Sequence, residues 1–281
     1  MDQVPQIAAE KADTVPRVNG KKSGWGEYTY MNGNRYEGSY VDDEMNGQGV
    51  FYFACGDRYE GTFKDDNFHG QGVYFYADGN RYEGSYVDDK MNGQGVCYYA
   101  NGDRYEGSYV DDKKSGQGVF YYASENRYEG SYVDDKRNGR GVFYFASGNR
   151  YEGSFKDGNF HGQGVYYFAN GDRYEGSYVD GKRNGQGVFY YADRDHYQGS
   201  FKDGNFHGQG VYFYANGDRY EGSYVDDKRN GQGVFYYASG SQQEKFYVNG
   251  VETGSPQEKS NVNGVETSGV VMSSTPCCML M

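Results

Sequence analysis

The residues best suited to covalent chemistry stand at the C-terminus, which reads Cys277-Cys278-Met279-Leu280-Met281. A cysteine four residues from the end, followed by two apolar residues and Met, fits the C-a-a-X pattern for farnesylation. One prenyl chain holds a protein to a membrane only weakly, so stable anchoring needs a second signal. Residues 260–281 contain no Lys or Arg. The sequence therefore predicts prenylation of Cys278, with palmitoylation of Cys277 as the second signal and a chance match as the alternative.

Arg and Glu recur in pairs such as Arg81/Glu83. Such pairs indicate either a charged binding stripe or a cross-strand charge ladder on a solvated face, where each pair contributes little stability. We favour the ladder. The pattern breaks at His196 and Gln198, either as a local contact point or as drift in one unit.

Three of the four histidines share the context Asn-Phe-His-Gly: His69, His161 and His207. At strand spacing they would lie on the order of 20 Å or more apart, whereas a metal site needs its ligands together. The chain has no P-loop, no dinucleotide fingerprint, no triad and no carboxylate pair with a distinct environment. We therefore predict no catalytic residue, no metal, no cofactor and no small-molecule substrate, and we do not expect an enzyme.

The secondary-structure elements that position these residues must form from a chain of unusual composition. Of 281 residues, 45 are Gly and 34 are Tyr, whereas Leu and Ile occur once each, which excludes a leucine-rich helical core. The net charge of -12, without any Lys/Arg cluster, argues against nucleic-acid binding. The N-terminus lacks an apolar signal segment, and no apolar run approaches the ~18 residues of a spanning helix. Four cysteines are too few for a disulfide framework, so we expect a reducing, cytosolic compartment.

A 23-residue repeat indicates that the Gly- and Tyr-rich part of the chain is folded rather than disordered. Tyr-Glu-Gly, once Tyr-Gln-Gly, recurs at this step and opens nine units, and a Gly-X-Gly pair keeps the same step. Each unit holds two strand signals separated by turn residues, and no helix fits between them. This predicts an all-β fold, an elongated, twisted single antiparallel sheet of stacked hairpins. Nine units of two strands would span roughly 90 Å.

The repeat also sets the domain organisation. We expect a flexible segment at 1–22, the repeat array at 23–240 with a half unit at 23–35, and a flexible polar tail at 241–281. The nine units start near Tyr36, Tyr59, Tyr82, Tyr105, Tyr128, Tyr151, Tyr174, Tyr197 and Tyr220.

Two aromatic residues per unit are expected to pack neighbouring units together. In the strand around Glu83, alternation puts Tyr82, Gly84 and Tyr86 on one face, and the glycine leaves room for a ring. We also predict that these aromatic residues bind a partner, since Tyr is favoured at interfaces. One row is formed by the nine Tyr that start the units. The second row is Tyr40, Phe63, Tyr86, Tyr109, Tyr132, Phe155, Tyr178, Phe201 and Tyr224.

Tyr-X-Gly-X-aromatic followed by Gly-X-Gly, in a 23-residue frame, resembles the MORN repeat (membrane occupation and recognition nexus). The resemblance covers residues 23–240 and recurs nine times. The family commonly has Trp at the second aromatic position, where this chain has Tyr or Phe. The resemblance implies a rod-like or curved sheet with a groove, acting as a scaffold, a dimerisation module or a membrane-associated module. In some relatives a lipid kinase or protein methyltransferase domain follows the repeats, and the stretch after the array is too short for either.

Three functions stay open on the sequence. The first is a non-enzymatic scaffold, tethered by C-terminal lipids to the cytoplasmic face of a membrane, that recruits protein partners or dimerises. The second is a soluble structural component of the cytoskeleton or a cilium. The third is a module that binds lipid headgroups directly; the acidic charge argues against it, because anionic lipid surfaces attract Lys and Arg.

Overall fold

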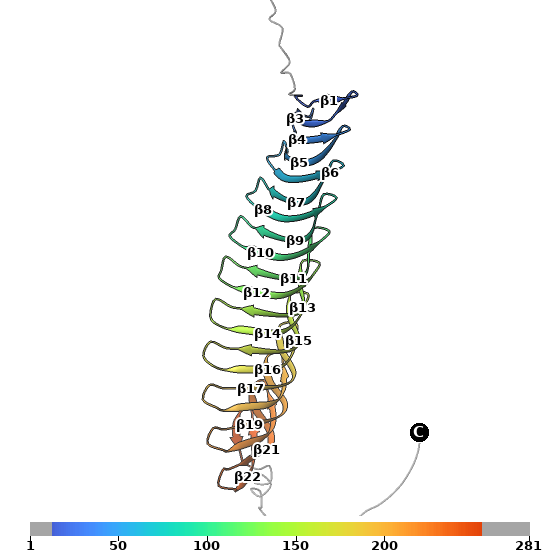
Figure 1. Ribbon diagram of the computed structural model, residues 1–281. Coiled ribbons are helices and arrows are strands. Elements are labelled where there is room, and N and C mark those ends of the chain that lie inside the picture. The colour runs from blue at the N-terminus through green and yellow to red at the C-terminus, as the bar shows by residue number, and fades with distance from the viewer. Residues whose placement is uncertain (1–12, 255–281) are drawn as a thin grey trace, which may run out of the picture.

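The computed structural model describes residues 13–254. These residues form strands and turns, with no helix among them. Figure 1 shows an elongated stack in which successive hairpins follow one another from β1 at one end to β22 at the other. The all-β prediction is confirmed. No described segment forms a helix of the length and hydropathy needed to cross a membrane.

Nine hairpins share one pattern, a seven-residue strand followed by a nine-residue strand. They are β4 (Arg35–Val41) and β5 (Glu44–Tyr52), β6 (Arg58–Lys64) and β7 (Asn67–Phe75), β8 (Arg81–Val87) and β9 (Lys90–Tyr98), β10 (Arg104–Val110) and β11 (Lys113–Tyr121), β12 (Arg127–Val133) and β13 (Lys136–Tyr144), β14 (Arg150–Lys156) and β15 (Asn159–Tyr167), β16 (Arg173–Val179) and β17 (Lys182–Tyr190), β18 (His196–Lys202) and β19 (Asn205–Phe213), and β20 (Arg219–Val225) and β21 (Lys228–Tyr236). They are preceded by β1 (Arg17–Val18), β2 (Lys21–Lys22) and β3 (Gly24–Thr29), and followed by β22 (Gln242–Val248) and β23 (Val251–Thr253).

The strands from β3 to β23 form one open antiparallel sheet. Each strand pairs with the next along the chain, from β3–β4 to β22–β23, and no pairing among the described strands joins β23 back to β3. β1 and β2 form a separate two-stranded sheet. This order is the stack of consecutive hairpins that the repeat predicts.

Alternation divides each strand between two faces. In β8, Tyr82 and Tyr86 are 0% and 3% exposed, whereas Val87 on the opposite face is 43% exposed. We call the face with Tyr82 and Tyr86 the aromatic face, and the face with Arg81, Glu83 and their equivalents the polar face. The core of the molecule is the aromatic face, as the sequence predicts.

The two glycine motifs exist because the ring of Tyr82 lies against its own hairpin. A Cβ on Gly84 would stand 2.5 Å from the Tyr82 hydroxyl and 2.6 Å from the Cα of Gly95, its partner across the strands. The hydroxyl donates a hydrogen bond to the carbonyl oxygen of Ser85 at 3.2 Å. Any side chain at Gly84 would therefore displace either the ring or the neighbouring backbone.

The rings of successive units form a continuous zigzag. Tyr82 contacts Tyr86 of its own strand with ring centroids 5.3 Å apart and Tyr109 of the next unit at 5.1 Å, both edge to face. Such pairs add about 0.5–1.5 kcal/mol beyond the area they bury. The aromatic rows thus join neighbouring hairpins into one rod, since a single hairpin could not bury them.

Turn residues add a second set of links between units. Asp88 and Asp89 have φ angles of 48° and 67°, as a tight two-residue hairpin turn requires. Asp89 accepts a hydrogen bond from the backbone N–H of Phe68 in the preceding hairpin at 2.8 Å. At the opposite edge, Asn80 accepts one from the backbone N–H of Ala100 in the next hairpin at 2.8 Å. Both edges of the rod are therefore tied along its length.

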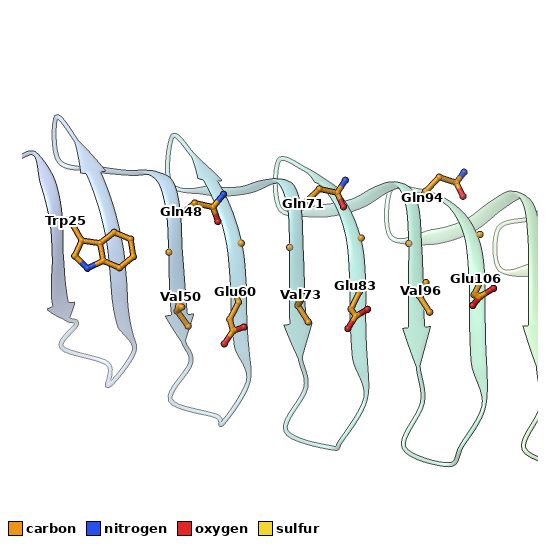
Figure 2. Close-up of a pocket in the computed structure, with 16 residues that line it drawn as sticks. Trp25, Gln48, Val50, Glu60, Gln71, Val73, Glu83, Gln94, Val96 and Glu106 are labelled. Atoms are coloured by element: carbon orange, nitrogen blue, oxygen red, sulfur yellow. The ribbon is translucent and has the colours of Figure 1, made fainter.

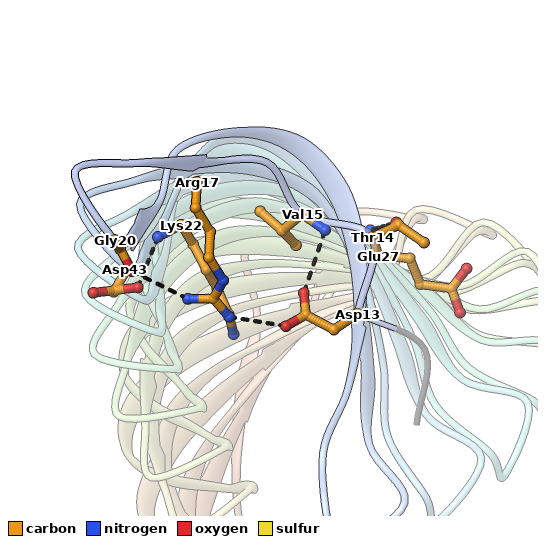
Figure 3. Close-up of polar contacts among 8 residues, drawn as sticks. All are labelled: Asp13, Thr14, Val15, Arg17, Gly20, Lys22, Glu27 and Asp43. Atoms are coloured by element: carbon orange, nitrogen blue, oxygen red, sulfur yellow. Dashed lines mark hydrogen bonds and ion pairs between the residues drawn. The ribbon is translucent and has the colours of Figure 1, made fainter. Parts of the chain in front are cut away.

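The array extends further at its N-terminal end than the sequence predicts. Asn19, with φ 53°, begins the β1–β2 turn in the same frame as Asp42, which has the same φ. The N–H of Thr14 donates to the carbonyl oxygen of Glu27 at 2.9 Å, and Val15 is 6% exposed within the core. Figure 3 shows the residues of this N-terminal cap. The prediction of flexible chain is therefore wrong for residues 13–22.

The C-terminal end also carries an additional, degenerate unit. Tyr247 in β22 is 5% exposed and follows Tyr224 by one repeat length. It contacts Tyr220 edge to face at 5.5 Å, as the second-row rings do elsewhere. The prediction of a flexible tail is wrong for 241–253, which continue the sheet because they keep this ring and the turn.

Candidate functional site

A series of open hollows follows the polar face, and together we call them the groove. Three hollows repeat the same residue positions, and Figure 2 shows the first, where Gln, Val and Glu side chains stand in rows on successive strands. Trp25, 56% exposed, lies at its N-terminal end. The rows are Gln48, Gln71, Gln94, Gln117, Gln163, Gln186, Gln209 and Gln232; Val50, Val73, Val96, Val142, Val165, Val211 and Val234; and Glu60, Glu83, Glu106, Glu129, Glu152, Glu175 and Glu221.

One wall of the groove is a ladder of side-chain hydrogen bonds. The Nε2 atom of Gln71 donates to Oγ of Ser85 at 2.8 Å, and Gln94 donates to Ser108 at 2.7 Å. Each bond joins two neighbouring hairpins. Because the amides are paired in this way, the wall presents a regular rather than a mobile surface.

The polar face also carries a stack of Arg and aromatic side chains beside the rows of the groove. The guanidinium carbon of Arg81 lies 4.3 Å from the ring centroid of Tyr98, and its Nη1 atom lies 2.9 Å from Oε1 of Glu83. The predicted charge ladder is present, but its pairs mostly lie within one strand rather than across strands. These half-exposed pairs each contribute about 0–1 kcal/mol.

At His196 and Gln198, where the other units have Arg and Glu, the stacking on aromatic rings is retained but the Arg–Glu ion pair is absent. The His196 ring lies parallel to Phe213 at 4.4 Å and to Tyr190 at 5.8 Å. His196 therefore replaces the stacked Arg by a stacked imidazole, and Gln198 replaces the Glu that would have paired with the missing cation.

The aromatic residues that we predict as partner-binding are hidden. All eighteen are at most 4% exposed, so they pack the core and offer almost no ring surface to another molecule. Burial raises the pKa of Tyr128 and Tyr174 to about 12. Their role in binding a partner stays an untested prediction.

Sequence reasoning missed the Gln, Val and Trp25 positions of the groove. Their signal is the same 23-residue step that revealed the aromatic rows, since Trp25 stands one repeat length before Gln48. Gln and Val are ordinary surface residues of a strand, and only their placement beside one another along the sheet makes a continuous surface.

The remaining predicted residues are separate from the groove or outside the described part. His69 and His207 each have Nδ1 near an Asp carboxylate, at 3.6 Å and 3.9 Å. Residues 13–254 hold no group of three or more potential metal ligands. Cys277 and Cys278 lie outside the described residues, so their lipidation stays a prediction.

The fold and the repeated surface define the class of protein, a β-hairpin repeat protein. The model of the MORN repeat matches residues 18–35 and then nine consecutive 23-residue segments, from 36–58 to 220–242. The chain belongs to the family of MORN-repeat proteins. No curated protein matches it at a significant level.

Several solved structures are similar in part. The TCP10 domain of Danio rerio CPAP is 14% identical, with 79% of this chain and 99% of that chain covered and a TM-score of 0.39. The SAS-4 TCP domain of Drosophila melanogaster, in complex with a proline-rich motif of Ana2, is 14% identical over 63% of this chain and 84% of that one, with a TM-score of 0.28. A virginiamycin B lyase of Staphylococcus aureus has a TM-score of 0.16, with 8% identity, 80% of this chain and 84% of that chain covered. Similarity at this level supports no statement on function.

Proposed function

We propose that this protein is a non-enzymatic scaffold that holds extended segments of partner proteins along the groove of its polar face. The observation that carries the proposal is the repetition of one set of Gln, Val and Glu positions along the sheet. The stability of the rod comes from the aromatic face, so the polar face is free to recognise a partner. A repeated surface of this kind suits a long, repetitive contact better than a single small ligand.

The spacing of the rows supports an extended polypeptide as the partner. Each unit contributes two strands at ~4.8 Å, so equivalent side chains recur at about 10 Å along the groove. An extended chain advances about 3.3 Å per residue. Every third residue of such a partner would therefore meet the same row, and the exposed ring of Trp25 would provide an aromatic anchor at one end.

The groove is tested by substitutions that leave the aromatic face untouched. In the full chain, Val96→Lys with Val142→Lys places two long cations in the groove, whereas Val110→Lys with Val133→Lys adds the same charge at two residues that are each 50% exposed and outside it. We expect cross-linked partner proteins, quantified by mass spectrometry, to fall about tenfold for the groove variant. The control variant should retain them, and equal retention by both folded variants contradicts the proposal.

We further propose that lipidation of Cys278, with Cys277 as the second site, tethers the scaffold to the cytoplasmic face of a membrane. This requires Met281 to be the last residue of the protein in the cell, because prenylation acts on a cysteine four residues from the end. Support comes from the Cys-Met-Leu-Met sequence and from Cys277 as a second attachment point, which stable anchoring requires.

The tether is tested by metabolic labelling with a prenyl probe, followed by fractionation. Wild type should incorporate the probe and sediment with membranes, and Cys278→Ser should lose both. Cys277→Ser should keep the prenyl label and lose most of the membrane-bound fraction. Unlabelled wild type overturns the tether, and unchanged fractionation of Cys278→Ser favours a cytoskeletal or ciliary component. Sedimentation equilibrium of the unlipidated chain distinguishes a second copy from other partners.

A further inference from the structure

A separate cavity of about 380 Å³ opens on the aromatic face near the C-terminal end of the array. Phe206 of β19 and Tyr212 of the same strand form part of its wall, and Arg183 of β17 and Arg229 of β21 also line it. The two arginines stand two repeat lengths apart, one on each side of Phe206. The cavity is thus an aromatic chamber with cations from both neighbouring hairpins.

The guanidinium of Arg183 is held in place without having its donors satisfied. Its carbon lies 5.1 Å from the ring centroid of Phe189 and 5.6 Å from that of Phe201. Within residues 13–254 it has no hydrogen-bond or ion-pair partner. By contrast, Arg137 at the same repeat position donates from Nη2 to the carbonyl oxygen of Gly158 at 2.7 Å. Arg183 therefore brings five free N–H donors to the cavity.

A second unsatisfied group also lines the cavity. Tyr224 is 3% exposed, and its hydroxyl has no hydrogen-bond partner among the described residues. Asp227 contributes the one carboxylate, and its Oδ1 atom accepts a hydrogen bond from the N–H of Phe206 at 2.8 Å. Among the lining residues, two cations stand against one carboxylate. The carboxylate of Asp195, which is outside the lining, accepts a hydrogen bond from the hydroxyl of Tyr212 at 2.9 Å.

The chain contains the same arrangement of stacked rings without the cations. Six repeat lengths towards the N-terminus, Phe68 stacks on Tyr59 at 3.9 Å, as Phe206 stacks on Tyr197 at 3.8 Å. The positions of Arg183 and Arg229 are there occupied by Met45 and Met91, and the position of Tyr224 by Tyr86, whose hydroxyl is also without a partner. The packing of the array accepts an uncharged side chain at both places. Packing does not require a cation at either place. The guanidinium of Arg229 donates to the hydroxyls of Tyr214 and Tyr247, whereas Arg183 has no such partner among the described residues, so its charge calls for another explanation.

We propose that this cavity binds a phosphate or carboxylate group carried on an aromatic ring. The Arg183 guanidinium and the Tyr224 hydroxyl donate hydrogen bonds to the oxyanion, since a guanidinium fork matches the geometry of such groups. The ring of the ligand packs against Phe206 and Tyr212. The site lies on the face opposite the groove, so it does not depend on the proposed scaffold function.

The test is calorimetric titration of the full chain with phenyl phosphate and with inorganic phosphate. Wild type should bind one phenyl phosphate, about tenfold more tightly than inorganic phosphate, because only the former fills the aromatic wall. Arg183→Met with Arg229→Met should weaken binding at least about thirtyfold, and Tyr224→Phe about fivefold, as expected for lost hydrogen bonds to a charged group and to a neutral hydroxyl. The matched control Arg137→Met should bind within about twofold of wild type.

The replacements are residues that the array already holds at equivalent positions, Met at 45 and 91 and Phe at 63, 155 and 201, so folding should be preserved. The reverse change, Met45→Arg with Met91→Arg, should create a second site and raise the stoichiometry from one to two. A peptide with phosphotyrosine that binds more tightly than phenyl phosphate assigns the ring to a partner protein, and equal affinity assigns it to a small molecule. The proposal is overturned if wild type does not bind phenyl phosphate, or if the Arg183/Arg229 variant binds it equally.

Discussion

The aromatic face and the polar face are made of alternate residues of the same strands, yet they perform different tasks. On the aromatic face, Tyr82 is fully buried, lies against Gly84 and touches rings of two hairpins. On the polar face, Arg81 stacks on Tyr98 and pairs with Glu83, and all three remain partly exposed. The difference teaches that the rows of buried aromatic residues do not mark the groove. The buried rings stabilise the rod, and the partly exposed Gln, Val and Glu side chains of the opposite face form the groove.

The largest expected difference between the faces comes from removing one ring from each. Tyr128→Ala deletes a side chain that is 0% exposed and should lower the free energy of unfolding by about 4 kcal/mol. Tyr144→Ala deletes a ring on the polar face of the same hairpin, stacked on Arg127 at 4.3 Å, and should cost about 1 kcal/mol. Urea unfolding followed by circular dichroism measures both. Equal losses would contradict the division into a core face and a surface face.

A second comparison uses two adjacent residues, Gly84 and Ser85, whose substitution by Ala should lower the free energy of unfolding by different amounts. Gly84→Ala forces a Cβ to within 2.6 Å of the Gly95 Cα and should destabilise the protein by about 3 kcal/mol. Ser85→Ala, one residue later on the polar face, removes only the bond from Gln71, at a cost of about 0.5–1 kcal/mol. Thermal unfolding of both variants decides the matter, and a Gly84→Ala protein as stable as wild type would refute the ring-on-glycine packing.

The buried tyrosines should also make the aromatic face sensitive to alkali. Burial raises the pKa of Tyr128, Tyr174 and Tyr220 to about 12, from the ordinary value of 10. Because the folded-state pKa lies above the unfolded one, this stability is complete below pH 10 and is lost as the pH rises through about 12. We expect phenolate absorbance and loss of β-sheet signal to rise together in that range. Ionisation of all tyrosines near pH 10 with the fold intact would contradict it.

The smallest effect is expected where the polar face departs from its own pattern. His196→Arg together with Gln198→Glu restores the stacked Arg–Glu pair found in the other units. Since such exposed pairs contribute little, the free energy of unfolding should change by less than about 0.5 kcal/mol. Denaturant unfolding of this variant beside wild type measures the change. An effect above about 2 kcal/mol would show that the polar face contributes more to stability than we assign to it.

Much of the fold is predictable because each unit repeats the same strand and turn residues every 23 residues. Alternation in Tyr82-Glu83-Gly84 predicted the buried row, and the Asn-Gly and Asp-Gly motifs predicted tight turns. The hairpin turn itself falls at Asp88-Asp89, and Asn92-Gly93 lies within β9. The ends were missed because they lack Tyr-Glu-Gly, although Asn19-Gly20 and Asn249-Gly250 keep the turns in the frame.

The candidate site was harder to predict than the fold. The sequence predicts that the glycine leaves room for a ring, but residue types alone do not tell that this ring belongs to the first-row Tyr of the same strand. The Gln and Val rows have no chemical signature of their own, and their continuity appears only when neighbouring hairpins are paired in register. The unsatisfied donors of Arg183 likewise depend on what surrounds that side chain, which a linear pattern does not contain.

The most direct test of the division between the two faces is hydroxyl-radical footprinting of the tyrosines in the native protein, read residue by residue by mass spectrometry. We predict strong protection of the first-row residues Tyr82, Tyr105 and Tyr128, which are 0% exposed, and clear modification of Tyr98, Tyr121 and Tyr144 on the polar face. Equal modification of the two sets, or protection of the second set alone, would contradict the division into a packed aromatic face and an exposed polar face.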